Sequence, residues 1–490
     1  MKFYKFQRGN ATLLTLFVFA VAGLAVFGLF NVGQQTTGKV RLQTVSDAAA
    51  YSVGTVVARD LNFKAYTNRA MVANQIAIAQ IVGLASWAQM FNRAATNLSY
   101  VATALSWIPV AGQIILTISR ALERGSAIVN NAIDRAAPAL VMAEEVLITA
   151  LAEAQRAFHV VTVAMAKDTL STVVEQSDSD IDTGALWSNA IFWGAFVRTW
   201  EGRQERYEAQ RVGDNSRTGI DNRERTAEFR DVTKASGDRF VNGRTYSWLP
   251  AITVPLLLKI RMEKYGGSEM MPGRTPGNRN NYQWTAMDSV GIEVGTWRCG
   301  FSGCGFKNYE EILPIGWGAA HALVTNSSYF NYQQYRRDRN LWGQGTWRLP
   351  MTSSLGAAEE GNNNLRKTDG LRPFYDLKDK GRVADDYLNL QVLLFKRGDK
   401  MRTMATVAAN NPNYVVAPGL NVEEKGGMAG NTMGALAKAG VYFYRPNEGD
   451  FIRPTDRKRE YGNLYNPYWQ VRLMPTSNAE RTAALAVAQF

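Results

Sequence analysis

The sequence has very few side chains suited to nucleophilic or metal chemistry. Its 490 residues include two cysteines, Cys299 and Cys304, and two histidines, His159 and His321. Two cysteines alone make a poor zinc site, and a histidine-based catalytic triad has almost no material. We expect both histidines to be packing or surface residues. The spacing Cys-Gly-Phe-Ser-Gly-Cys can close a tight disulfide loop, which we expect in an oxidising compartment; two free thiols are the alternative.

Sequence motifs that mark common enzyme classes are also missing. There is no His-Glu-x-x-His, no phosphate-binding Gly-x-x-x-x-Gly-Lys-Ser/Thr loop, and residues 300–304 depart from Gly-x-Ser-x-Gly at the last position. Residues 178–182 (Asp-Ser-Asp-Ile-Asp) begin like a calcium loop but lack its glycine and final glutamate, so we interpret them as a polar linker. A catalytic pair of carboxylates is not excluded, because any protein with 43 acidic residues contains some such pairs. We expect that the protein is not an enzyme and binds neither a metal ion nor a cofactor.

The charge balance is basic, with a net charge of +12 and a pI of about 9.5. Such a surface favours anionic partners: phospholipid headgroups, an envelope polymer such as peptidoglycan, or nucleic acid. The alternative is that the charge serves solubility alone. Nucleic acid is not the expected partner, because the basic and aromatic segment 198–244 holds nearly as many acids as bases.

The N-terminus predicts a membrane anchor. Residues 1–9 carry three basic side chains and no acid, and residues 10–38 are uncharged. Within them, residues 11–30 are mostly apolar and long enough to span a bilayer. The basic flank places the N-terminus in the cytoplasm, so we expect a single-pass inner-membrane protein with its bulk in the periplasm of a Gram-negative cell. A cleaved signal peptide is the alternative, although its apolar run is usually shorter.

The two halves of the chain differ sharply in composition. Residues 1–175 hold two of the fifteen prolines and nine of the forty-two glycines. We therefore predict an α+β protein with three segments: a basic tip and anchor at 1–38, a helical stalk or hairpin at 39–175, and a loop-rich mixed α/β domain at 176–490.

The helical half is expected to fold back on itself. Apolar residues recur three or four positions apart from Val45 to Leu61, the period of one helix face. The uncharged stretch 94–119 is interpreted as helix, turn and helix; the alternative is a second membrane span. Pro138 predicts a kink or a second break. Because this half has few charged residues, much of its helical surface should be covered, either by the C-terminal half or by other subunits.

The C-terminal half contains short β-branched and aromatic runs between glycine, proline and asparagine. We predict a solvated helix with loops at 198–244, and long polar, mobile connections at 266–282 and 353–372. The predicted strands are residues 252–260, 290–297, 388–395, 441–444 and 469–473.

Sequence patterns at both ends resemble the TadG-like proteins of tight-adherence (Flp-type) pilus assembly systems. The N-terminal pattern is a basic-glycine entry into one apolar span, followed by an alanine-rich helix. The C-terminal pattern is a pair of aromatic, β-prone runs. The segments are Gln-Arg-Gly-Asn-Ala at 7–11, Leu-Gln-Thr-Val-Ser-Asp-Ala-Ala-Ala at 42–50, Leu-Asn at 61–62, Thr-Asn-Arg-Ala-Met-Val-Ala-Asn-Gln at 67–75, and the stretches 439–446 and 466–473.

The resemblance implies a non-catalytic envelope protein that assists assembly or anchoring of an adhesive type IV-like pilus, with pilin-like proteins and the assembly machinery as partners. Two departures matter. Gly9 is followed five positions later by Leu14 rather than glutamate, so processing as a pilin precursor is not expected. Some relatives carry a metal site of the form Asp-x-Ser-x-Ser; the nearest words here, at Asp214, follow a charged segment, and we expect no metal there.

Two stretches are predicted interaction sites. Residues 67–75 should pack helix on helix, with Arg69 pairing to an acid, and residues 466–473 should dock the C-terminus as an edge strand. The named candidates are Asn68, Arg69, Met71, Asn74, Pro467, Tyr468, Trp469 and Arg472.

A second hypothesis comes from another class of protein. Thirty-eight of the fifty-three aromatic residues follow residue 175, and aromatic faces stack on sugars as well as in cores. The chain could thus be a periplasmic peptidoglycan- or glycan-binding protein or hydrolase.

Overall fold

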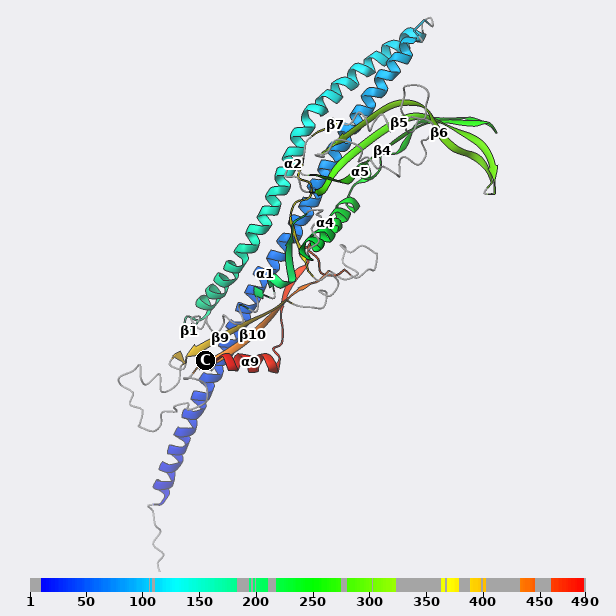
Figure 1. Ribbon diagram of the computed structural model, residues 1–490. Helices are drawn as coiled ribbons and strands as arrows, with labels where there is room; N and C mark the ends of the chain where they lie inside the picture. Colours follow the sequence, from blue (N-terminus) through cyan, green and yellow to red (C-terminus); the bar gives the residue numbers. More distant parts are fainter. Residues whose placement is uncertain are drawn as a thin grey trace, which may run out of the picture. The chain divides into compact units, whose positions relative to one another are not determined.

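The chain combines long helices with antiparallel sheets, which confirms the expected α+β class. We analysed a computed structural model. It describes residues 10–104, 106–107, 111–182, 194, 197–198, 200–209, 217–274, 280–301, 303–322, 363–365, 368–378, 388–397, 400–401, 432–445 and 460–488. The helices are α1 (Asn10–Ala104), α2 (Ala111–Ser177), α4 (Arg217–Ala235), α5 (Arg239–Asn242) and α9 (Asn478–Ala488). Figure 1 shows them with the strands between and after them.

The chain divides into two compact units. The first comprises Met1–Ala65, Ala157–Glu205 and Leu377–Phe490, and the second comprises Tyr66–Arg156 and Arg206–Asp376. Each unit therefore contains a stretch of α1 and a stretch of α2. The three consecutive segments of the sequence analysis were predicted from residue composition, whereas these units are defined by contacts in space. The predicted boundaries therefore stay a prediction.

Helix α1 runs without a break from the apolar N-terminal stretch into the alanine-rich segment. No proline occurs between residues 10 and 104, and alanine, the strongest helix former, is the commonest residue of the segment. The side that the apolar spacing predicted is buried in the first unit. Its residues include Leu42, Val45, Ala49, Val53, Val56, Val57 and Leu61.

Helix α2 returns after a short turn at residues 106–107, as the pattern of 94–119 predicted. In the second unit it runs beside α1, where Ser126 donates to the Asn92 Oδ1 at 3.1 Å. Pro138 lies inside an unbroken α2, so of the two predicted alternatives the second break was wrong and the kink stays a prediction. An interior proline removes one helix hydrogen bond, and the rest of this long helix stays paired around it.

The sheet of the first unit has four strands in the order β1-β9-β10-β11, all antiparallel. Its strands are β1 (Ile181–Asp182), β9 (Leu388–Arg397), β10 (Thr432–Phe443) and β11 (Trp469–Leu473). Strands β9 and β11 begin at the residues that alternating apolar positions predicted. The prediction at 441–444 found only the end of β10, because residues 434–440 are mostly glycine and alanine, which have weak strand preference.

The sheet of the second unit is built on two long hairpins. Its order is β3-β4-β5-β6-β7, with β3 (Tyr246–Val254), β4 (Leu258–Arg274), β5 (Asn280–Gly300), β6 (Gly303–His321) and β7 (Asn363–Asn364). Strands β2 (Gln204–Tyr207) and β8 (Phe374–Leu377) form a separate two-stranded sheet.

Several predictions in this region were wrong. The strand expected at 252–260 contains the turn between β3 and β4 at residues 255–257. The mobile connection expected at 266–282 is mostly strand, because Gly266–Arg274 pairs with residues 280–288 of β5. Of residues 353–372, residues 363–365 and 368–372 are described, and Leu365 and Leu371 are buried. The segment 198–244 contains α4 as predicted, but Phe229 and Arg244 in it are buried rather than solvated.

In the second unit α1 packs directly against the backbone of β6. A Cβ atom at Gly318 would lie 2.2 Å from the Ser86 carbonyl oxygen, and one at Gly316 would lie 2.6 Å from the Met90 carbonyl oxygen. Glycine at these two strand positions therefore sets the distance between helix and sheet. Ser86, Arg93 and Asn97 complete the contact by donating to the carbonyls of Gly318, Trp317 and Ile315 at 2.8–3.1 Å.

Candidate functional site on the first helix

The first two dozen residues of α1 form an exposed apolar helix. Leu13, Leu16 and Phe19 are each at least 70% exposed. Thr15 and Thr36 turn their hydroxyls back to the carbonyls four residues earlier, at 2.6 and 2.8 Å, so they present little unsatisfied polarity. Among the described residues, this is the one helix long and apolar enough to cross a membrane. It is consistent with the predicted single-pass anchor.

Directly after the apolar stretch, α1 is joined to strand β10. Lys39 donates to the Gly434 carbonyl oxygen, Gln43 to that of Leu436 at 3.1 Å, and Ser46 to that of Ala435 at 3.1 Å. Polar side chains spaced three or four apart thus pair with consecutive carbonyls of a strand. The folded body of the first unit therefore begins within about one helical turn of the uncharged segment.

Asp178 gathers basic side chains beside this junction. Its carboxylate accepts from Lys396 at 2.9 Å and lies 3.3 Å from Arg41 Nε. Burial opposes ionisation of Asp178, but the hydrogen bond from Lys396 and the charges of both bases lower its pKa overall. The segment interpreted as a polar linker is therefore an ion-paired corner. It borders a polar cavity of about 470 Å³.

A buried charge cluster occupies the α1–α2 contact of the first unit. Lys64 donates to Asp60 at 2.6 Å and to the Gln204 side chain at 2.7 Å, and its Nζ lies 2.8 Å from His159 Nδ1. Both charged side chains are fully buried. Burial lowers the pKa of Lys64 to about 8. Burial opposes ionisation of Asp60, but the charge of Lys64 and the hydrogen bonds from His159 and Lys64 together lower the pKa of its carboxyl group. Trp200 covers the ammonium at 5.5 Å.

The second unit holds another buried charge cluster. Asp288 accepts two hydrogen bonds from the Arg244 guanidinium at 2.8 and 3.0 Å and one from Lys264. Ser86 of α1 adds a fourth at 2.7 Å. Burial disfavours the Asp288 carboxylate, but the two bases lower its pKa. The spacing of Asp60 and Lys64 along one helix is local, but the sequence offered no signal for the other members of the two clusters, because they are far apart along the chain.

The predicted interaction stretch 67–75 lies in the core of the second unit. Asn68 donates to the Tyr375 carbonyl at 2.9 Å and accepts from Gln155 of α2 at 2.7 Å, and Met71 is fully buried. Asn74 is half-buried and bonds only its own helix, at the Ala70 carbonyl. Arg69 is exposed and makes no ion pair with a described residue, so the expected pairing is not present there.

The predicted stretch 466–473 contains edge strand β11. Trp469 is buried, and its backbone N–H and carbonyl both pair with the Asn62 side chain of α1, at 3.0 and 2.9 Å. Tyr468 packs edge-on against Phe443 at 5.9 Å, and Pro467 is half-buried. Arg472 is exposed and lies 5.4 Å from the Tyr442 ring.

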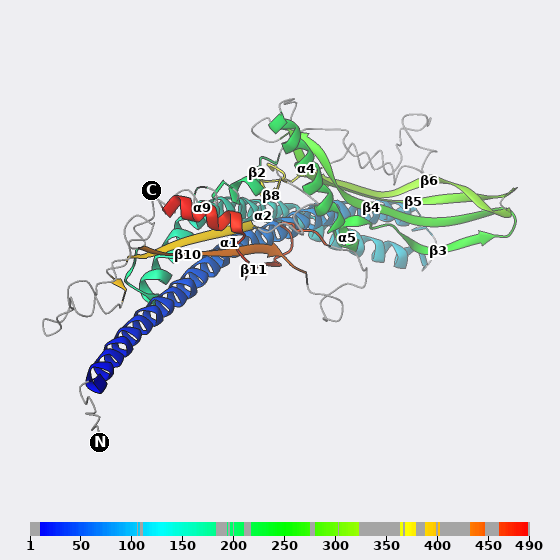
Figure 2. The same ribbon diagram turned by 90° about the horizontal axis from the view of Figure 1, so that it is seen from below.

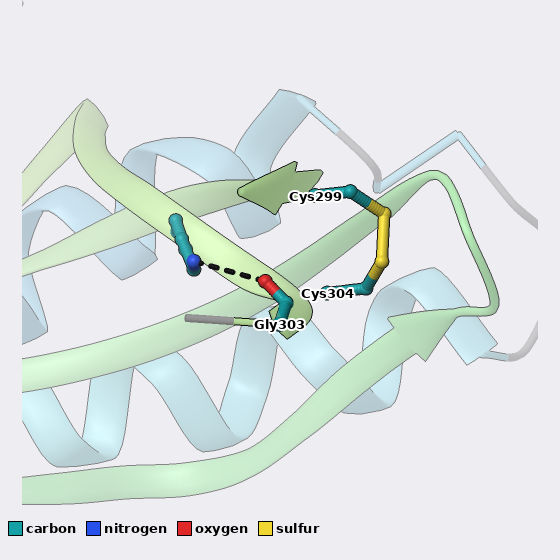
Figure 3. Close-up of a disulfide and its surroundings, with 4 residues drawn as sticks. Cys299, Gly303 and Cys304 are labelled. Carbon is teal, nitrogen blue, oxygen red and sulfur yellow. Dashed lines mark hydrogen bonds between the residues drawn. A yellow bond between two sulfur atoms is a disulfide. The ribbon is translucent and has the colours of Figure 1, made fainter. Parts of the chain in front are cut away.

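Cys299 and Cys304 form a disulfide across the end of the β5–β6 hairpin. They are opposite each other in the strand register, and Lys307 donates to the Gly303 carbonyl at 3.1 Å beside them, as Figure 3 shows. The bond therefore closes the hairpin at its tip rather than joining distant parts of the chain.

The side chains of these sites pack and pair within the fold. The described residues contain no group of three or more His, Cys, Asp or Glu side chains able to hold a metal. Several large aromatic side chains of the C-terminal half serve the core. They include Trp200, Phe229, Trp284, Phe374 and Trp469. Asp214 lies outside the described residues.

Residues 9–59 match the family model described as Flp pilus-assembly TadE/G-like. The match covers the anchor helix, its junction with β10 and the start of the buried helix face. The resemblance to TadG-like tight-adherence pilus proteins is confirmed over this segment, and the match supports involvement in Flp pilus assembly. Neither the curated proteins nor the solved structures gave a match.

Proposed function

We propose that this chain, with its TadE/G-like N-terminal segment, is a non-catalytic, single-pass inner-membrane protein that helps assemble or anchor an Flp-type pilus. The observation that carries the proposal is the match at residues 9–59 on a helix whose apolar part is exposed and whose next turns are built into a folded unit. The basic residues before the apolar stretch favour a cytoplasmic N-terminus and a periplasmic body.

The outer side of α2 in the second unit is our proposed contact with pilin-like helices. Ile128, Leu140 and Leu147 are each more than half exposed, and no charged residue occurs between Arg135 and Glu144. Helices that associate through packing favour such runs of apolar and small side chains. The alanine-rich composition of this helix fits close approach of a second helix.

Crosslinking followed by membrane purification tests both parts of the proposal. A photoreactive residue at Leu140 should capture pilin-like or pilus-assembly chains, identified by mass spectrometry. The matched control is the same residue at Asp221, an exposed position on α4, which should capture far less. Recovery of cell-wall enzymes instead, or pili unchanged in number and attachment after deletion of the gene, would contradict the proposal.

A further inference from the structure

Two turns lie at one end of the five-stranded sheet of the second unit. The β3–β4 turn is closed by a hydrogen bond from the Leu257 N–H to the Val254 carbonyl, and the Trp297 N–H of β5 donates to the Leu257 carbonyl at 3.1 Å. The β5–β6 hairpin continues four residues past Trp297 to its own turn at Phe301, roughly 13 Å at the rise of a strand. Both turns thus occupy the same end of the sheet (Figures 1 and 2).

This end, which we call the distal tip, is exposed and apolar. Leu256 is 71% exposed, Leu257 63%, and Phe301 is fully exposed. Ile252 adds a further exposed apolar side chain from the end of β3. The segment 248–258 (Trp-Leu-Pro-Ala-Ile-Thr-Val-Pro-Leu-Leu-Leu) contains one hydroxyl and no charge. Scattered exposed hydrophobic residues are ordinary, but several large ones gathered at one end of a sheet mark a contact surface.

The backbone is strained at this tip. Leu256 has φ 60°, a left-handed conformation that glycine adopts freely and leucine rarely does. Glycine at this position would form the same turn with less strain. A large apolar side chain is nevertheless held there, pointing into solvent. Local strain retained at an exposed side chain indicates that the side chain is used.

The charged residues nearest the tip are basic. Residues 248–260 and 294–309 contain Lys259, Arg298 and Lys307 but no Asp or Glu, while Arg261 behind them is paired with Glu293 at 2.7 Å. Arg298 is exposed, one residue from the disulfide, and Trp297 packs edge-on against Phe306 at 4.9 Å just behind it. Apolar side chains at an extreme end, aromatic residues behind them and basic residues alongside are the arrangement that binds an anionic bilayer surface.

We propose that the distal tip inserts shallowly into a phospholipid surface that carries anionic headgroups, separately from the N-terminal anchor and independently of the pilus assignment. Phe301, Leu256 and Leu257 enter the boundary between headgroups and acyl chains, and Arg298 and Lys307 meet the phosphates. The Cys299–Cys304 bond keeps the hairpin closed, so that Phe301 is presented without an ordering cost on contact.

Vesicle docking by the full chain tests this inference. The anchor is held in a nanodisc of phosphatidylcholine, and flotation then measures binding to vesicles of phosphatidylglycerol and phosphatidylcholine in equal parts. The triple variant Leu256→Gly, Leu257→Ser, Phe301→Ser should show vesicle binding reduced by at least about tenfold. Arg298→Gln with Lys307→Gln should weaken binding to these vesicles by about fivefold per charge and leave binding to pure phosphatidylcholine vesicles unchanged.

The control variant is Val160→Ser with Val161→Ser, which removes two exposed apolar side chains from α2 in the first unit; its docking should equal that of the unaltered chain. Four of the substituted tip residues are exposed and Lys307 is half-buried, so thermal unfolding should show the variants folded. Vesicle binding no better than that of empty nanodiscs, or unchanged binding of the triple variant, would overturn the proposal. The proposal would also be overturned if a tip variant kept its vesicle binding but changed the oligomeric state measured by sedimentation. The tip would then bind a second copy of this chain rather than lipid.

Discussion

At the scale of single residues, Lys64 is the most constrained side chain on α1. It is fully buried beside an equally buried Asp60 and contacts His159 and Gln204. Lys64→Met should lower the free energy of unfolding by about 3 kcal/mol, because it leaves the Asp60 carboxylate buried without its ammonium partner. Thermal unfolding in detergent measures the change.

The matched control is the double variant Asp60→Leu with Lys64→Met. It replaces the whole ion pair by apolar groups of similar size and should recover most of the loss, since a buried ion pair contributes little net stability over a packed apolar pair. A double variant as unstable as Lys64→Met alone would show that the Asp60–Lys64 ion pair contributes net stability to the fold.

His321 gives the second unit a response to acid. Burial lowers its pKa from the ordinary 6.5 to about 4, so the folded state keeps the imidazole neutral where the unfolded chain protonates it. Stability should therefore fall as the pH drops from 6.5 to about 4, by up to about 3 kcal/mol. Chemical unfolding across this window measures the slope. His321→Leu should flatten it, and an unchanged slope would show that other groups cause it.

Such residues mark the limit of what the sequence could reveal. The spacing of Val45, Ala49 and Val53 predicted the buried face of α1, because helix periodicity is local. The association of Lys64 with Gln204, 140 positions away, depends on the tertiary fold. The disulfide lies between these cases, since both cysteines belong to one hairpin.

At the scale of elements, the fit between α1 and β6 depends on glycine. Gly318→Ala should lower the free energy of unfolding by about 1–3 kcal/mol, because the new methyl group would lie 2.2 Å from the Ser86 carbonyl oxygen and force helix and strand apart. Unfolding by denaturant measures the loss. Gly305→Ala is the control, with nothing within 4 Å of its added Cβ, and should change stability little. Equal effects of the two substitutions would contradict the packing described.

Strand β11 was predicted from sequence, whereas most of β4 and β6 was not. β11 is a short aromatic and β-branched run, the signal that single-sequence reasoning detects. β4 and β6 contain Gly266, Gly267, Gly316 and Gly318, and their pattern is that of loops. Those glycines are required because neighbouring side chains or the α1 backbone occupy the space of a Cβ, as at Gly266 and Gly316.

At the scale of the whole molecule, the anchor and the folded body meet within one helix. Deletion of residues 1–33 should release the protein from membranes, because the exposed apolar run is removed, while the α1–β10 contacts that begin at Lys39 keep the first unit folded. Alkaline extraction of membranes, with circular dichroism of the released chain, checks both parts. Retention of the truncated chain in the extracted pellet would point to a second membrane segment.

The unbroken α1 has a mechanical consequence. Its 95 residues extend roughly 140 Å as one hydrogen-bonded helix that begins at the apolar stretch. No proline or loop separates that stretch from the contacts with β10 in the first unit. A load applied to the first unit would therefore reach the proposed membrane anchor as a direct axial pull, without a slack linker to absorb it.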